Sequence, residues 1–186
     1  MFTLSGFVVG AIVGLTGVGG GSLMTPLLVL VFGIHPATAV GTDLLYAAIT
    51  KAGGTFVHAK KDHVDWRITR LLATGSIPAA LLTIWALSFL PKQSDEVSHV
   101  ISVSLGIALL LTAGAIIFRH KLQNHALAHA DDSAHTQLRA PITIAVGALL
   151  GVLVTVSSVG AGALGVAVLF YLYPRLPTIR IIGSDV

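Results

Sequence analysis

Residues Gly14–Ser22, GLTGVGGGS, place three consecutive glycines inside the uncharged apolar stretch Phe7–Phe32. Glycine disfavours a helix interior by about 1 kcal/mol relative to alanine, so this run predicts a helix interruption. Backbone N–H and C=O groups freed by an interruption are costly in lipid unless they face protein or a cavity. The stretch therefore predicts two half-helices that meet at a break lined by protein.

The whole chain is too poor in charge for a water-soluble surface. Of its 186 residues, 54% are hydrophobic and 10% are charged, whereas soluble domains carry about 25% charged residues. We therefore predict an all-α integral membrane protein with the lipid bilayer as its solvent. The lysines and arginines lie in short loops rather than in a stripe, so no nucleic acid is expected as a partner. The chain has no cysteine, which excludes thiol redox chemistry and thiolate metal sites.

Five long apolar segments alternate with polar connectors, and a sixth begins near Ile181. The five are Gly6–Phe32, Thr38–His58, Ile68–Leu90, Val97–Phe118 and Ile142–Tyr173. The middle three are close to the ~20 residues that span a bilayer as a helix. Loops 58–67 and 119–139 are the basic ones, and two helices separate them, so both are predicted to be cytoplasmic.

An internal repeat links the two broken segments. Gly6–Leu23 aligns without gaps to Gly147–Leu164, and Gly41–Asp43 recurs as Gly183–Asp185. We predict a polytopic helix bundle with two homologous repeats, each opening with a glycine-broken helix. The divisions are a first repeat (1–118), a polar His-rich linker (119–140) and an incomplete second repeat (141–186). Completing the second copy needs on the order of 70 to 90 further residues, so we expect the chain to be a fragment.

Arg175 and Arg180 bear on how the broken helices lie in the membrane. If Gly6–Phe32 and Ile142–Tyr173 cross completely, both arginines face outward, against the usual charge bias. If each segment is a re-entrant pair of half-helices, both arginines face inward and the repeat is inverted. We favour the re-entrant arrangement.

Paired interruptions in two halves of a membrane protein indicate a transporter's binding site. The helix that restarts near Ser22 points N-terminal amides, which carry partial positive charge, at the break, and such termini bind anions. The alternative is tight packing of small residues, as we expect for Gly6, Gly10 and Gly14. The predicted substrate-binding backbone comprises Gly17, Gly19, Gly20, Gly21 and Ser22, with Ser158, Gly160 and Gly162 in the second copy.

Two charges, Asp43 and Lys51, interrupt one apolar segment, where each costs about 2.5–3.5 kcal/mol at the bilayer centre. We predict that Lys51 counters an anionic substrate, and that Asp43 and Asp185 couple protons or orient helices. Their neighbours Thr42 and Ser184 are included in the site. The alternatives are a Lys51 side chain that extends to the interface and an Asp43 that only caps a helix.

Catalytic and metal sites are not predicted. No nucleophile–base pair is visible in the spacing, so the chain is not expected to be an enzyme, and no cofactor is expected. The tract His125–His135 contains three histidines and two aspartates, a pattern compatible with a weak metal site. Its alanine-rich polar sequence favours a flexible linker instead.

Four stretches together resemble the sulfite exporter TauE/SafE family, also called the 4-toluene sulfonate uptake permeases. They are GLTGVGGGSLMTPLLVLVFGIHPATAVGTDLL, HVDWR, GSIPAALL and YPRLPTIRIIGSD. The resemblance implies a multi-pass permease of the bacterial inner membrane for small sulfur-containing or organic anions such as sulfite or sulfonates. It also implies secondary transport driven by an ion gradient, with a proton as the expected coupling ion, and is compatible with a homo-oligomer. The alternative is a non-transporting membrane scaffold or helix-packing subunit.

Overall fold

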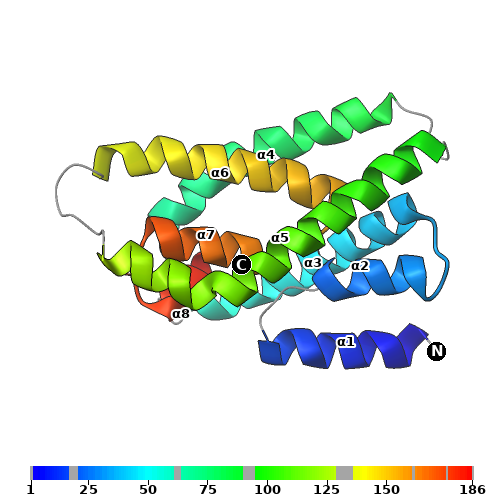
Figure 1. Cartoon of the computed structure of the whole chain (residues 1–186), viewed down its shortest axis with the longest axis horizontal. Helices are drawn as coiled ribbons and strands as arrows, with labels where there is room; N and C mark the ends of the chain where they lie inside the picture. The colour runs from blue at the N-terminus through cyan, green and yellow to red at the C-terminus, as the bar shows by residue number, and fades with distance from the viewer. Residues whose placement is uncertain are drawn as a thin grey trace.

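The computed structural model describes residues 2–16, 21–60, 64–89, 95–128, 136–160, 162–174 and 176–185. All regular structure in these ranges is helical (Figure 1), which confirms the predicted all-α bundle. The helices are α1 (Phe2–Thr16), α2 (Gly21–Leu30), α3 (Pro36–Lys60), α4 (Trp66–Ser88), α5 (Asp95–Ala128), α6 (Thr136–Ser157), α7 (Ala163–Leu172) and α8 (Thr178–Asp185).

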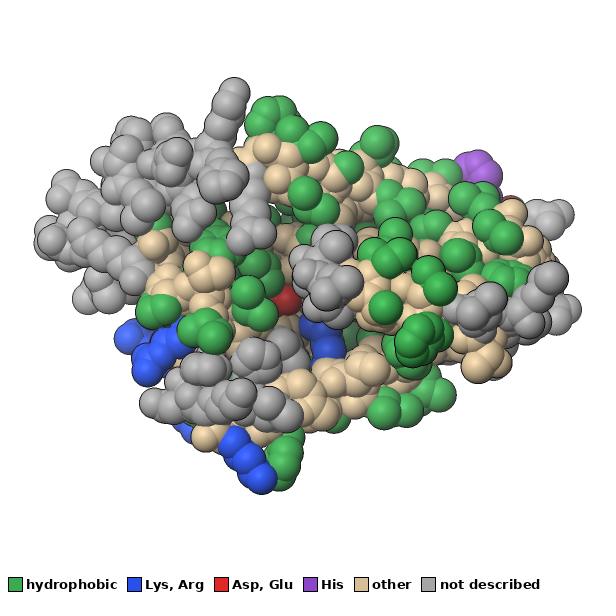
Figure 2. All heavy atoms as spheres, turned by 90° about the horizontal axis from the view of Figure 1, so that it is seen from below, with side chains coloured by type: hydrophobic (Ala, Val, Ile, Leu, Met, Phe, Trp, Pro, Cys, Tyr) green, Lys and Arg blue, Asp and Glu red, His purple; other side chains and the backbone are tan. Residues whose placement is uncertain are grey.

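The helices turn apolar side chains outward, as expected for a protein in lipid. Leu30, Leu110 and Ile117 are each at least 74% exposed, and Figure 2 shows hydrophobic side chains spread over the surface. Among the described residues, three helical stretches are long and apolar enough to cross a membrane. They are Trp66–Ser88, Glu96–Phe118 and Ala140–Ser157. The 25-residue α3 is not one of the three, and it carries Asp43 and Lys51 within its length.

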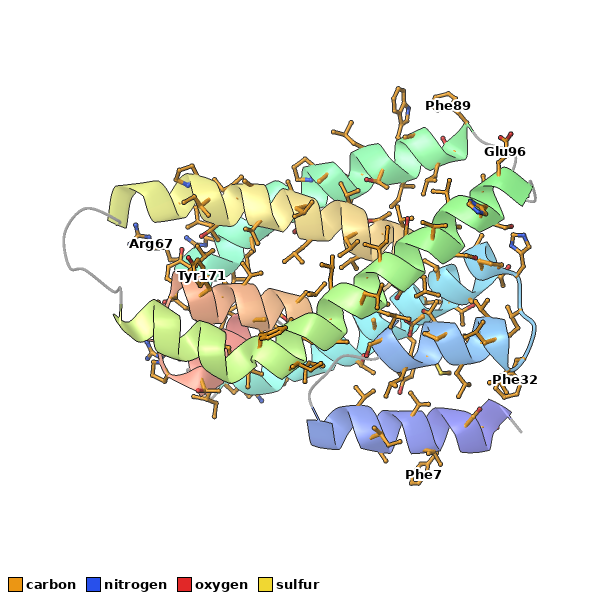
Figure 3. The ribbon with its side chains drawn as sticks, in the orientation of Figure 1. Phe7, Phe32, Arg67, Phe89, Glu96 and Tyr171 are labelled. Atoms are coloured by element: carbon orange, nitrogen blue, oxygen red, sulfur yellow. The ribbon has the colours of Figure 1, made fainter. Side chains whose placement is uncertain are left out.

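Each segment predicted to be broken contains two helices. α2 and α7 have 10 residues each, which rise about 15 Å, half of the ~30 Å hydrocarbon core. In Figure 1, α2 runs opposite to α1 and α7 runs opposite to α6. Figure 3 places Tyr171, near the end of α7, at the same end of the bundle as Arg67. The two helices of each pair thus run antiparallel, and the re-entrant arrangement stays a prediction.

α4 and α6 form the most extensive helix contact, and glycines allow it. A Cβ added at Gly147 would lie 2.5 Å from the Leu72 carbonyl oxygen, and one at Gly151 would lie 2.6 Å from the Ser76 carbonyl oxygen. Close backbone approach at small residues drives helix association in membranes. The repeat-related Gly6 of α1 has no described atom within 4 Å of its Cβ position, so packing there is not observed.

The predicted polar linker is helical over much of its length. α5 continues past the apolar segment to Ala128, and α6 already begins at Thr136. The residues between Phe118 and Ala128 include leucine, lysine, glutamine and alanine, which are good helix formers and extend the membrane helix beyond its apolar part. Residues 129–135 lie outside the described ranges.

Candidate functional site

The turn between α6 and α7 is held in a special backbone conformation. Ser158 has φ of 59° and is the one described non-glycine residue with positive φ, while Gly160 has φ of 117°. The Ser157 hydroxyl donates to the Leu153 carbonyl and accepts from the Val159 amide at 3.2 Å. Leu and Val side chains lie 3.4–3.7 Å from the Cβ position of Gly160. Gly160 is therefore required for the positive φ of the turn, because side chains already fill the space beside it.

Asp43 joins this turn to the first broken segment. Its carboxylate is 1% exposed, and Oδ2 accepts hydrogen bonds from the hydroxyls of Thr25 in α2, at 2.8 Å, and Ser158, at 2.7 Å. Oδ1 is buried and has no hydrogen-bond partner among the described residues. One carboxylate thus connects α2, α3 and the α6–α7 turn, which the sequence places 115 residues away.

Lys51 and Asp185 form a second cluster, farther along α3. The Lys51 ammonium donates to the Asp185 backbone carbonyl at 2.9 Å and lies 4.0 Å from Oδ2. The carboxylate lies directly over Gly165, the third residue of α7, where an added Cβ would overlap Oδ1 and lie 2.9 Å from Cγ. Lys51 therefore bonds within the protein, to Asp185.

The two clusters both include a residue of α3. Eight residues separate Asp43 from Lys51, which is about 12 Å along α3. The turn before α7 contributes Ser158 to the first cluster, and the third residue of α7, Gly165, lies against the Asp185 carboxylate of the second. The turn and the first residues of α7 are thus connected to both clusters.

Other predicted site residues are not members of these two clusters. Gly21 and Ser22 open α2, whereas Gly17, Gly19 and Gly20 lie outside the described residues. The exposed Thr42 donates to the Thr38 carbonyl of its own helix at 2.8 Å. Gly162 precedes α7 as its N-cap, without a side-chain bond.

Ser184 connects α8 to the start of α4. Its hydroxyl accepts from the Asp65 amide at 2.8 Å and donates to the Arg180 carbonyl at 2.7 Å. The Asp65 side chain in turn caps α4 by accepting from the amides of Arg67 and Ile68. Ser184 therefore contributes to helix packing, and its neighbour Asp185 carries the negative charge of α8.

A cleft of about 1210 Å³ lies between α2, α3, α4, α5 and α6. Its lining includes His35, whose ring Nε2 is 2.8 Å from the Ser98 hydroxyl. Figure 3 shows Phe32, Phe89 and Glu96 at this end of the bundle, away from Arg67. The lining also includes Leu44, next to Asp43, and Val156, two residues before Ser158. The cleft lining thus includes sequence neighbours of Asp43 and Ser158, but none of the three residues of the Asp43 cluster.

Two residues of these clusters were not predicted. Thr25 is a lone hydroxyl in an apolar run, and its position just before Pro26 was the available signal. Gly165 aligns with Met24 in the first copy, so the repeat could not single it out. Both are recognised by what they contact, since Thr25 bonds to Asp43 and Gly165 makes room for Asp185.

Comparisons with known proteins give a family and several relatives. The family model described as "Sulfite exporter TauE/SafE" matches residues 2–186. The chain is 38% identical over 183 residues to the "Probable membrane transporter protein YjnA" of Bacillus subtilis, covering 98% of this chain and 71% of that protein. A "Probable membrane transporter protein" of Xylella fastidiosa is 32% identical over 186 residues, and the chain spans 66% of its length. No solved structure matches.

Proposed function

We propose, because the chain belongs to the sulfite exporter TauE/SafE family, that it moves a small anion such as sulfite or a sulfonate across the bacterial inner membrane by secondary transport. The names of the family and of the relatives indicate a membrane transporter rather than an enzyme or a scaffold. The substrate class, the proton gradient as driving force and the inner membrane are our proposals.

The single observation that carries this function is that a carboxylate already lies where we place the substrate. The Asp185 carboxylate, 10% exposed, lies over Gly165 in the first turn of α7, with the Lys51 ammonium 4.0 Å away. The N-terminal turn of a helix carries partial positive charge and favours anions. A sulfite or sulfonate offers the same negative oxygen atoms, so it would compete with Asp185 for Lys51 and for this turn.

The substrate site that we propose therefore consists of Lys51 and the first turn of α7, from Gly162 to Gly165. The α6–α7 turn at Ser158 and Gly160 positions that helix start. The glycine-rich break before Ser22 supplies the corresponding helix start in the first copy. Two helix starts from two copies of one repeat are the arrangement on which many transporters build their substrate site.

The orientation that we propose follows from the basic residues. Figure 2 shows Lys and Arg side chains gathered toward one end of the face it presents, and Figure 3 places Arg67 at that same end. By the positive-inside rule this end is cytoplasmic, with loops 58–67 and 119–139. Three helices, α3, α4 and α5, separate the two broken pairs, so repeats 1–118 and 141–186 would be inverted in the membrane.

The proposal is tested by anion flux into liposomes that contain the full chain. Under an imposed pH gradient we expect Lys51→Met to abolish uptake of labelled sulfite. The double variant Lys51→Met/Asp185→Asn should also fail to transport, although it no longer leaves Asp185 charged without its cation. Lys60→Met is the matched control, since Lys60 is exposed at the end of the same helix, over the Phe56 ring, and should transport normally. Wild-type uptake by the double variant would remove Lys51 from the site.

A further inference from the structure

The Asp43 cluster differs from the substrate site in the sign of its charge. Its carboxylate is 1% exposed and two hydroxyls donate to Oδ2, at 2.7 and 2.8 Å. A carboxylate repels the anionic substrate, and an ionised one is costly within a membrane without a positive partner. Its placement therefore calls for a positive charge of some kind.

No basic side chain of the described residues supplies that charge. α2 contains no titratable residue, and between Ala140 and Leu172 the helices α6 and α7 contain only Tyr171. On α3 the nearest cation is Lys51, two helical turns away and bonded to Asp185. The remaining described titratable side chains of α3 and the elements packed on it are Tyr46 and Lys60 on α3, Glu96 and His99 on α5, and Arg180 and Asp185 on α8.

The repeat provides an internal comparison. Asp185, which corresponds to Asp43, has the Lys51 ammonium as its counter-charge. Asp43 has no such residue, and its Oδ1 atom is buried without a hydrogen-bond donor among the described residues. A buried acceptor without a donor costs about 1–3 kcal/mol, and more when it is charged. The counter-charge of Asp43 is therefore expected to be a diffusible ion.

The atoms around Asp43 suit a small monovalent cation. The hydroxyl oxygens of Thr25 and Ser158 keep acceptor lone pairs while they donate to Oδ2. α6 ends at Ser157, and a helix end leaves its last carbonyls without intrahelical donors. One carboxylate balances one positive charge, and the described residues contain no group of three His, Cys, Asp or Glu that would favour a divalent metal. Unwound backbone and half-helix ends hold Na⁺ or H⁺ in other transporters.

We propose that Asp43, with Thr25 and Ser158, binds a monovalent cation, H⁺ or Na⁺, which enters through the cleft and balances the charge of the carboxylate. The cleft lining includes Gly41, Leu44 and Val156, which surround this cluster along the chain. When the cation leaves, the ionised carboxylate no longer has a charge partner and keeps only the two hydroxyl donors, a costly state within a membrane. This inference rests on the proposed function, and it names the coupling ion's site.

The test uses infrared spectroscopy and thermal unfolding of the full chain in lipid nanodiscs, with Na⁺ exchanged for choline at constant ionic strength. If H⁺ binds, the wild type shows the C=O stretching band of a protonated carboxyl group, which titrates with pH and ignores Na⁺. If Na⁺ binds, the midpoint temperature of unfolding rises with Na⁺ and any such band disappears on Na⁺ addition. Either response should be lost in Asp43→Asn and kept in Asp185→Asn.

A second variant distinguishes loss of the cation site from a folding defect. Thr25→Val keeps the shape of the side chain and the charge of Asp43, so it should fold, yet it should weaken the Na⁺ response or shift the pH at which the carboxyl band titrates. The absence of both responses in the wild type would overturn the inference, as would responses that survive in Asp43→Asn. Cation binding is measured here without any anion. A protein that binds the cation but transports no anion would therefore contradict only the proposed function.

Discussion

Breaking the Lys51–Asp185 pair tests the second cluster through stability alone. In Lys51→Met the Asp185 carboxylate stays 10% exposed but loses its cation and the ammonium bond to its backbone carbonyl. At 4.0 Å and an effective dielectric constant of about 20, the pair attraction is about 4 kcal/mol. The Lys51 side chain is 32% exposed, so screening by solvent reduces this value. We expect the free energy of unfolding to fall by about 2–3 kcal/mol.

The complementary variants complete a double-mutant cycle. Asp185→Asn keeps the backbone carbonyl that Lys51 binds, so we expect a smaller loss of about 1 kcal/mol. In Lys51→Met/Asp185→Asn no charge is left without a partner, and stability should return to within about 1 kcal/mol of the wild type. The assay is reversible unfolding of the full chain in mixed micelles, followed by circular dichroism. Losses that simply add in the double variant would refute an interaction between the two side chains.

Two further predictions concern packing and are checked by thermal unfolding and hydrogen exchange. Gly151→Ala places a Cβ 2.6 Å from the Ser76 carbonyl oxygen, so α4 and α6 must separate and stability should fall by about 1–3 kcal/mol. Gly114→Ala, with no atom within 4 Å, should instead stabilise by up to about 1 kcal/mol, and a shift of the same sign in both would contradict the packing argument. Ser184→Ala removes the acceptor of the Asp65 amide and should cost about 1–3 kcal/mol. Exchange at that amide should accelerate, and an unchanged rate would show that the bond contributes nothing.

The sequence was informative wherever a residue type conflicts with lipid. Asp43 and Lys51 were singled out because charges are costly in a membrane helix, and both lie in buried or half-buried clusters. The glycine-rich stretches were interpreted as helix interruptions because glycine disfavours a helix interior, and residues 17–20 of the first stretch lie outside the described residues. The structure begins α2 at Gly21 and α7 at Ala163, close to the predicted restarts.

Partners across the bundle could not be predicted in the same way. Ser158 bonds to Asp43 and Lys51 bonds to Asp185 over more than 100 residues of sequence, and local patterns do not report such distances. Thr42 was included because it lies beside Asp43, but successive residues on a helix face different directions. Its hydroxyl bonds to the Thr38 carbonyl and its side chain is exposed.

The length of α5 shows a different limit. The apolar segment ends near Phe118, whereas the helix continues to Ala128. Hydropathy reports the part of a helix that lies in lipid, and a helix can extend into water wherever its residues favour the conformation. The division of the chain at residues 119–140 stays a prediction.

The central claim is that a small anion occupies the place held by the Asp185 carboxylate, beside Lys51 and the first turn of α7. Equilibrium binding of sulfite to the full chain, measured by calorimetry in nanodiscs for the wild type and three variants, tests it most directly. We predict that Asp185→Asn binds sulfite more tightly than the wild type, because it removes the competing charge. The Kd should fall by up to about tenfold for each 1.4 kcal/mol of competition that the substitution removes. Lys51→Met should lose binding, while Lys60→Met matches the wild type. Equal affinity in Asp185→Asn, Lys51→Met and the wild type would contradict the claim.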